Sequence, residues 1–116
     1  MERRIILLNA LPLNAFPSDW DNFAITVYRV STDYLKSAIK KASEIKCYIR
    51  HPATVELLKK LLEVELKPSA ELYKYTEGDS IFVITLKTPE RGKEATEVRQ
   101  EDIEVYYVEA EPGICR

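Results

Sequence analysis

The sequence has a single histidine, two cysteines and no excess of basic residues, and each shortage excludes a class of protein. One histidine with the widely separated Cys47 and Cys115 gives no zinc-ligand spacing, so no metal site is expected. No apolar run approaches the roughly 20 residues that span a bilayer. A net charge of −2 lacks the basic surface that holds a long duplex by counterion release, so we expect no membrane partner and no duplex DNA.

Length and composition predict one globular domain over residues 1–116, with a flexible tail at 110–116. Asparagine and glutamine are scarce whereas lysine and glutamate are abundant, which is typical of a thermophilic source. The opening "MERRIILLNAL" has a basic start and a short apolar stretch, but Asn9 and Pro12 interrupt it. We interpret it as a first strand rather than a signal peptide, and we expect an intracellular protein.

Hydrophobic periodicity predicts six strands and two helices. "RIILLN" (4–9) is a nearly continuous apolar run of the kind found in strands buried on both faces. "FAITVYRV" (23–30) and "IKCYIR" (45–50) alternate like strands, and Cys47 is expected to be a small core residue. "STDYLKSAIKKASE" (31–44) has a helical apolar stripe that includes Ala42.

The second half of the chain predicts a second helix, a hairpin and a last strand. Pro52 suits the first helical position, because its missing N–H would have no partner there, and the helix is expected to run to Glu63. "ELYKY" (71–75) and "SIFVITLK" (80–87) flank "TEGD", which predicts a hairpin with Gly78 in the turn. "IEVYYVEA" (103–110) is the last strand. The fold class is α+β, a mixed sheet with both helices mainly on one face.

His51 stands where the third strand ends and the second helix begins. The first N–H groups of a helix carry partial positive charge and lack helical partners, so such a position can bind an anion. Arg50 adds a cation beside His51, and Thr54 adds a hydroxyl in the first turn. An imidazole placed there can act as a general acid toward a phosphodiester. A lone histidine after a strand is more often a loop residue or a helix cap, so the position alone leaves both roles open.

Three stretches together resemble the archaeal-virus anti-CRISPR ring nucleases, which degrade cyclic tetra-adenylate. They are "LLNALPLNAF" after the first strand, "IRHPATVELLKKLL" after the third and "LKTPERGKE" after the hairpin. The family shows an "L-x-N-A-F-S-x-N" type loop, a "G-H-x-x-T" segment that opens a helix, and a charged "R-x-x-E-G-K" loop. The resemblance covers about Ile5 to Val108.

The resemblance implies a role for each matching residue. His51 matches the family's catalytic histidine, and Thr54 matches the threonine one helical turn later. The first loop, which lines the adenylate ring in the family, is matched at the residues Asn9, Ala10, Leu11 and Asn14.

The chain departs from the family pattern at several of these positions. Pro12 replaces a hydroxyl residue of the first loop, and Arg50 occupies the family's glycine position. In the third segment Gly92 and Lys93 fit, but Thr88 stands at the family's arginine and Arg91 at its glutamate. Arg91, Lys93 or Arg50 could supply the missing cation.

What the resemblance implies is a metal-independent, cofactor-free hydrolase in the cytoplasm of an archaeal host. It would cleave cyclic tetra-adenylate into linear di-adenylates with 2′,3′-cyclic phosphate ends, and so switch off type III CRISPR signalling. A C₂ homodimer is expected, because a ring of four identical nucleotides can have two-fold symmetry and a C₂ dimer presents two copies of one site.

Two other functions stay open. A non-catalytic module that binds cyclic oligoadenylate or nucleic acid needs no transition-state groups, which fits the altered third segment. An interaction protein could instead pair its "VYYVE" strand with a partner at a sheet edge. The adjacent Tyr106 and Tyr107 are compatible with that, although core packing on opposite sheet faces explains them too. Trp20 could stack on a base or cover the edge of the core.

Overall fold

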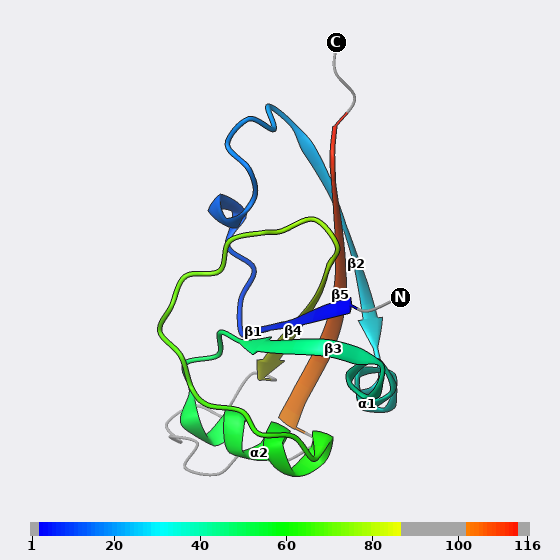
Figure 1. The fold of residues 1–116 in the computed structure, drawn as a ribbon, viewed down its shortest axis with the longest axis vertical. Coiled ribbons are helices and arrows are strands. Elements are labelled where there is room, and N and C mark those ends of the chain that lie inside the picture. Colours follow the sequence, from blue (N-terminus) through cyan, green and yellow to red (C-terminus); the bar gives the residue numbers. More distant parts are fainter. Residues whose placement is uncertain (1–2, 87–101, 114–116) are drawn as a thin grey trace.

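Five strands form one mixed sheet in the order β2-β5-β4-β1-β3 (Figure 1). The computed structural model describes residues 3–86 and 102–113. Within these ranges the elements are β1 (Arg3–Leu8), the short 3₁₀ helix η1 (Leu13–Ala15), β2 (Phe23–Val30), α1 (Thr32–Lys40), β3 (Ala42–Cys47), α2 (Pro52–Leu62), β4 (Asp79–Leu86) and β5 (Ile103–Pro112). The predicted α+β class with a mixed sheet is confirmed.

Strand β1 lies inside the sheet and is paired in parallel with β3 on one side and β4 on the other. Its central residues, Ile5 to Leu8, are at most 3% exposed. A strand covered on both faces has no polar side to show, which is why its sequence is continuously apolar rather than alternating. The expectation of a doubly buried first strand is therefore confirmed.

The two helices lie on the same face of the sheet, below it in Figure 1. Leu35 and Ile39 of α1 and Val55 and Leu58 of α2 are buried in one core with Leu7 and other residues of that face. Their spacing of three and four residues gives each helix a single apolar side. The predicted arrangement of both helices on one face is thus confirmed.

The opposite face is covered by residues 9–22, which include η1, and by the later part of segment 63–78 around Tyr73 and Tyr75, whereas Leu66 of that segment packs on the helix face (Figure 1). An aromatic cluster closes this second core. Phe16 stacks on Trp20 with centroids 6.1 Å apart, and Tyr75 contacts both rings. A backbone hydrogen bond of 2.8 Å from Tyr75 N–H to Ala15 O ties the two segments together. Of the two roles weighed for Trp20, core cover is the one that the structure shows.

Segment 71–75 is not a strand, so the predicted hairpin is wrong. Strand β4 pairs with β1 on one edge and β5 on the other, which leaves it no free edge for a third strand. Tyr73 is instead buried in the second core, and the Tyr75 N–H donates to Ala15 O at the end of η1. The predicted turn itself is present: Gly78 has φ +93°, and Asp79 N–H donates to Thr76 O.

Helix α1 is shorter than predicted. It ends at Lys40, and Lys41 N–H closes it by donating to Ala38 O. Ala42, which the apolar stripe placed on the helix, begins β3 instead. Parallel pairing of β3 with β1 from this residue onward takes precedence over the last turn of a helix.

Strand β5 runs through the region expected to be a flexible tail. Residues 110–112 are paired with β2, and Phe23 lies opposite Pro112. Gly113 N–H continues the contact by donating to Asn22 O at 2.8 Å. Because β5 is paired on both sides, by β2 and β4, the "VYYVE" segment offers no free edge to a partner. Tyr107 packs on the helix face and Tyr106 on the other, as core packing predicts.

Cys47 is half-buried against the helix-face core, in agreement with its prediction as a core residue. Burial raises the pKa of its thiol, and a backbone hydrogen bond at Ile49 offsets only part of that rise. The thiol therefore stays protonated and unreactive near neutral pH. Cys115 lies outside the described residues.

Candidate functional site

Three neighbouring parallel strands, β3, β1 and β4, end at the same edge of the sheet. Leu7 lies opposite Cys47 and also opposite Phe82, so β1 and β3 leave the sheet side by side, whereas β4 continues to Leu86. Residue 9 follows β1 and residue 48 follows β3 at this edge. In open sheets of this type ligands bind beyond the carboxyl ends of the parallel strands. Two of the three stretches singled out in the sequence therefore meet at one edge.

Arg91 and Lys93, expected to bind substrate, lie outside the described residues, as does Thr88.

His51 caps the amino end of α2. Its backbone is extended (φ −76°, ψ 111°), Pro52 holds the first helical position, and Val55 N–H donates to His51 O at 3.2 Å. Ile49, fully buried two residues earlier, anchors the approach to the helix, and its carbonyl accepts from Ser69 N–H at 2.9 Å. The predicted cap at the start of α2 is confirmed, but β3 ends at Cys47 rather than at Arg50, so residues 48–50 separate His51 from the strand.

Thr54 holds the imidazole of His51. The Thr54 N–H donates to Nδ1 at 3.3 Å, and the Thr54 hydroxyl oxygen lies 3.0 Å from the same nitrogen. In the neutral ring Nδ1 is thus an acceptor, which puts the proton on Nε2. In the protonated ring Nδ1–H can donate to the threonine hydroxyl, and Nε2 again carries hydrogen. Nε2 is therefore the proton-bearing nitrogen in both states, and no residue of the described ranges bonds to it.

The buried position of Thr54 decides its role. The residue is 3% exposed, whereas His51 is partly exposed. A hydroxyl this buried, and already within hydrogen-bond distance of Nδ1, orients the imidazole rather than reaching for a ligand. The structure thus shows Thr54 as a partner of His51 Nδ1, and its expected contact with substrate stays a prediction.

The start of α2 offers fewer free donors than a bare helix end. Of the N–H groups that a helix start leaves without a helical partner, Pro52 has none and that of Thr54 is bound by the ring. The Ala53 N–H is the remaining donor of the first turn. An anion at this helix end would therefore meet one backbone N–H, the His51 ring and the adjacent Arg50. Arg50 is exposed and forms no ion pair within the described residues.

The loop after β1 presents its polar residues to solvent. Asn9, Ala10 and Asn14 are exposed, and Asn14 lies in η1. Leu11 is half-buried and packs against the second core, so its side chain supports the loop. Ala15, 6% exposed, fixes the end of the loop through its bond from Tyr75. Asn9 and Ala10 directly follow β1 at the sheet edge that leads to His51, whereas Asn14 lies in η1 on the second-core side, away from α2 (Figure 1).

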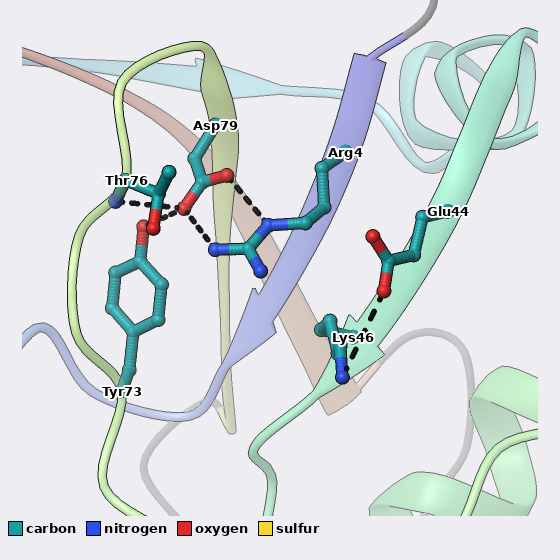
Figure 2. Close-up of polar contacts among 6 residues, drawn as sticks. All are labelled: Arg4, Glu44, Lys46, Tyr73, Thr76 and Asp79. Carbon is teal, nitrogen blue, oxygen red and sulfur yellow. Dashed lines mark hydrogen bonds and ion pairs between the residues drawn. The ribbon is translucent and has the colours of Figure 1, made fainter.

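A buried polar network at the opposite end of the sheet was not found from the sequence (Figure 2). The Asp79 carboxylate, at the start of β4, accepts from Arg4 through Nε and Nη2, both at 2.7 Å. The Tyr73 hydroxyl donates to Oδ2 at 2.6 Å, and Thr76 N–H donates to it at 3.1 Å. The signal was present: a carboxylate in the "TEGD" turn and an arginine opening a buried strand.

The pKa values of this network follow from its geometry. Burial alone would raise the pKa of Asp79, but the hydrogen bonds from Arg4, Tyr73 and Thr76 outweigh burial and lower it. Burial, and then the bond to Asp79, raises the pKa of Tyr73. The carboxylate is ionised and fully paired at neutral pH, so the network is a structural clamp between β1, β4 and the 63–78 segment.

Two further observations concern metals and membranes. No group of three histidine, cysteine, aspartate or glutamate side chains in residues 3–86 and 102–113 is arranged to hold a metal ion. Within the same ranges no helix combines the length and the apolar character needed to cross a membrane.

The fold and the site define a small α+β protein whose helix-capping histidine stands at the carboxyl ends of parallel strands. The profile of the STIV B116-like family matches residues 5–111, and the chain belongs to this family. Among solved structures it is similar to B116 of Sulfolobus turreted icosahedral virus (STIV), with 19% identity and a TM-score of 0.68. The match covers 90% of this chain and 97% of that chain. A comparison with curated proteins finds no match.

At 19% identity the likeness to B116 establishes the fold. The archaeal-virus part of the expected relationship is confirmed at the level of the family. The nuclease part remains a proposal.

Proposed function

We propose that this protein is a metal-independent ring nuclease that cleaves cyclic tetra-adenylate into linear di-adenylates with 2′,3′-cyclic phosphate ends. Such an activity would remove the second messenger of type III CRISPR signalling. The observation that carries the proposal is the pair of contacts that Thr54 makes with His51 Nδ1 through its N–H and its hydroxyl. These contacts leave hydrogen on Nε2 in both the neutral and the protonated resting ring. This is what a general acid needs at a strand end beside a cation.

The proposed reaction is an internal transesterification. The ribose 2′-oxygen attacks the adjacent phosphorus in line, so an O2′–P bond forms as the P–O5′ bond breaks. The 2′-hydroxyl proton passes to solvent, and the protonated His51 gives its Nε2 proton to the leaving O5′. The ring is then transiently neutral with its hydrogen on Nδ1, which donates to the Thr54 hydroxyl; this is the reverse of the resting neutral tautomer, in which Nδ1 accepts from Thr54 N–H. A new proton from solvent at Nε2 restores the acid.

The surrounding residues supply binding and charge stabilisation. Asn9, Ala10 and Asn14 are exposed on the anchored loop that follows β1, and we assign them to the adenylate ring. Arg50 precedes His51 in the chain and the Ala53 N–H lies in the first turn of α2; we assign to both the stabilisation of the charge that develops on the phosphorane oxygens.

A C₂ homodimer is part of the proposal. A cyclic tetranucleotide can have two-fold symmetry, and two copies of one site across a two-fold axis would place two His51 residues at opposite phosphodiesters. The measurable consequence is a stoichiometry of one ring for two chains. Light scattering with and without the ring, followed by calorimetric titration, tests it; one ring bound per isolated chain would contradict it.

The decisive experiment is a cleavage assay in EDTA. Labelled cyclic tetra-adenylate is incubated with excess protein, and the products are resolved against linear di-adenylates that end in 2′,3′-cyclic phosphate. Formation of those products by the native chain, and their loss in His51→Asn, supports the proposal. Recovery of intact ring at every temperature up to unfolding of the protein overturns it.

A non-catalytic module that binds the same ring is the second candidate. The specific observation in its favour is that α2 keeps one free first-turn N–H, because Pro52 has none and the His51 ring binds that of Thr54. That leaves little backbone charge for a phosphorane. The assay above separates the two, since this module would bind the ring with a measurable affinity and return it unaltered.

A further inference from the structure

A cavity of about 380 Å³ lies on the helix face of the sheet, between α1 and the strands β1, β4 and β5. Its principal lining residues are Tyr34, Ser37, Lys41, Ser80, Phe82 and Tyr107. None of them belongs to the site at His51. Ser80 lies opposite Ile5 near the amino ends of β4 and β1, whereas His51 follows their carboxyl side. The cavity is therefore a separate feature of the molecule.

Three aromatic rings form one wall of this cavity. Phe82 lies 5.2 Å from Tyr107 and 6.1 Å from Tyr34, and the two tyrosine rings are 6.3 Å apart, all measured between centroids. Phe82 is 1% exposed, but Tyr34 is 50% exposed. A large aromatic side chain left half open above a hollow presents a π-face to whatever enters it.

A buried hydroxyl forms the floor. Ser80 is 4% exposed and stands on β4 among the apolar side chains of Ile5 and Phe82. The Ser80 side chain forms no hydrogen bond with any residue of the described ranges. Every fully enclosed side-chain nitrogen or oxygen in those ranges has a hydrogen-bond partner, so the Ser80 hydroxyl is not fully enclosed. The hydroxyl therefore opens into the cavity. A polar group held this deeply without a protein partner is available to a ligand.

A cation stands at the rim. Ser37 lies on α1 and Lys41, four residues later, is its C-cap, so the two lie on the same side and both line the cavity. Lys41 is exposed and has no ion pair within the described residues. It is the one charged residue among those that line the cavity. The rim of the cavity therefore attracts a negatively charged group.

We propose that this cavity binds a small planar aromatic molecule that carries one anionic substituent. The ring stacks on Tyr34, a polar atom on its edge bonds the Ser80 hydroxyl, and the anionic group pairs with Lys41. The volume lies near the lower end of the range for small-molecule sites, which sets the ligand at one or two fused rings. This site does not depend on the proposed nuclease activity.

The test uses three matched probes: indole-3-acetate, its neutral analogue indole-3-acetamide, and the non-aromatic anion cyclohexylacetate. Each is titrated into the full ¹⁵N-labelled chain, and amide shifts are followed by NMR. Indole-3-acetate is expected to bind with a dissociation constant of about 1 mM or tighter and to shift the amides of α1 and of Ser80. The other two probes are expected to bind about threefold to fivefold more weakly.

Four variants place the binding. Lys41→Ala is expected to abolish the preference for the acetate over the acetamide, whereas Lys40→Ala, an exposed control on the same helix, keeps it. Ser80→Ala weakens both indoles, and Ala38→Phe fills the cavity and blocks them. Shifts that map to the His51 edge, equal affinity for all three probes, or no binding overturn the proposal. Amide shifts at the cavity that change with protein concentration in the absence of any probe also overturn it, because they would show that a second copy of the chain covers the site.

Discussion

Arg4 and Asp79, 75 residues apart in the chain, form a two-pronged ion pair that joins the first residues of two parallel strands (Figure 2). The Asp79 side chain is 2% exposed, and the Arg4 side chain is 25% exposed. Planar guanidinium and carboxylate groups match in shape, so both hydrogen bonds are made at once. The same carboxylate also holds Tyr73 and Thr76, and the pair therefore fixes a loop as well as two strands.

Replacing Asp79 by asparagine is expected to lower the free energy of unfolding by about 2 kcal/mol, because charged hydrogen bonds become neutral ones in a buried position. Urea unfolding monitored by circular dichroism measures the change. Glu44→Gln is the matched control, since the Glu44–Lys46 pair is exposed and 3.7 Å long; its effect should stay within about 0.5 kcal/mol. Equal effects of the two substitutions would contradict the clamp.

Acid should weaken the same clamp. The pKa of Asp79 in the folded chain lies below its ordinary value of 3.8, so the folded state binds this proton less tightly than the unfolded state. The stability that Asp79 contributes is therefore complete above about pH 4 and is lost as pH falls through the folded-state pKa. The difference in unfolding free energy between the native chain and Asp79→Asn is expected to shrink from pH 5 to pH 2. A difference independent of pH would rule the shift out.

At His51 two substitutions separate catalysis from capping. His51→Ala removes the acid and also the helix cap, so it should lose about 1 kcal/mol of stability as well as activity. Asparagine is a good N-cap residue but cannot donate a proton at this step. His51→Asn is therefore expected to keep the unfolding midpoint and the affinity for cyclic tetra-adenylate while single-turnover cleavage falls about 10²–10⁴-fold. Near-native cleavage by His51→Asn would remove His51 from the mechanism.

Thr54→Val tests the positioning role of the threonine. Valine keeps the shape and the N–H that donates to Nδ1, but it removes the hydroxyl that accepts from the protonated ring. Cleavage is expected to fall about tenfold to a hundredfold in the rate constant, with little change in ring affinity. Thr26→Val, at an exposed position on β2, is the control. A loss of affinity with an unchanged rate constant would instead make Thr54 a substrate contact.

Helix α2 ends in a residue that glycine would suit better. Glu63 has φ 55° and ψ 43°, the left-handed region that L-residues with a side chain adopt at a cost. Glu63→Gly is expected to stabilise the chain by about 0.5 kcal/mol, after allowance for the added freedom of the unfolded state. Gly78→Ala should do the reverse by about 1 kcal/mol, because φ there is +93° and no steric contact contributes. Thermal unfolding of both variants checks the signs.

The sequence predicted those helices and strands whose formation depends on neighbouring residues in the chain. His51 followed by Pro52 predicted the start of α2, and the structure shows both the cap and the proline at the first helical position. The alternation of "FAITVYRV" predicted β2 with its observed bounds. Segment 71–75 alternates just as well, yet it is not a strand, because β4 already has two neighbours and the sequence does not record which edges are occupied. Ala42 changed from helix to strand for a similar non-local reason, its pairing with β1.

The candidate site was predictable only in part. The sequence placed His51 at a strand end, but the bond between Thr54 and Nδ1 depends on backbone geometry that no spacing rule provides. Asp79 is invisible as a partner of Arg4 at a separation of 75 residues. Arg91 and Lys93 lie outside the described residues, so their predicted contacts stay predictions.

The position of β5 in the interior of the sheet has a consequence for how the chain acquires its structure. The strand that joins β2 to β4 is the last one to leave the ribosome, so the earlier strands must wait for it with exposed edges. Topologies dominated by such distant pairings fold in milliseconds to seconds rather than microseconds. Nascent chains lacking residues 103–112 should remain sensitive to proteases and dependent on chaperones until that segment emerges.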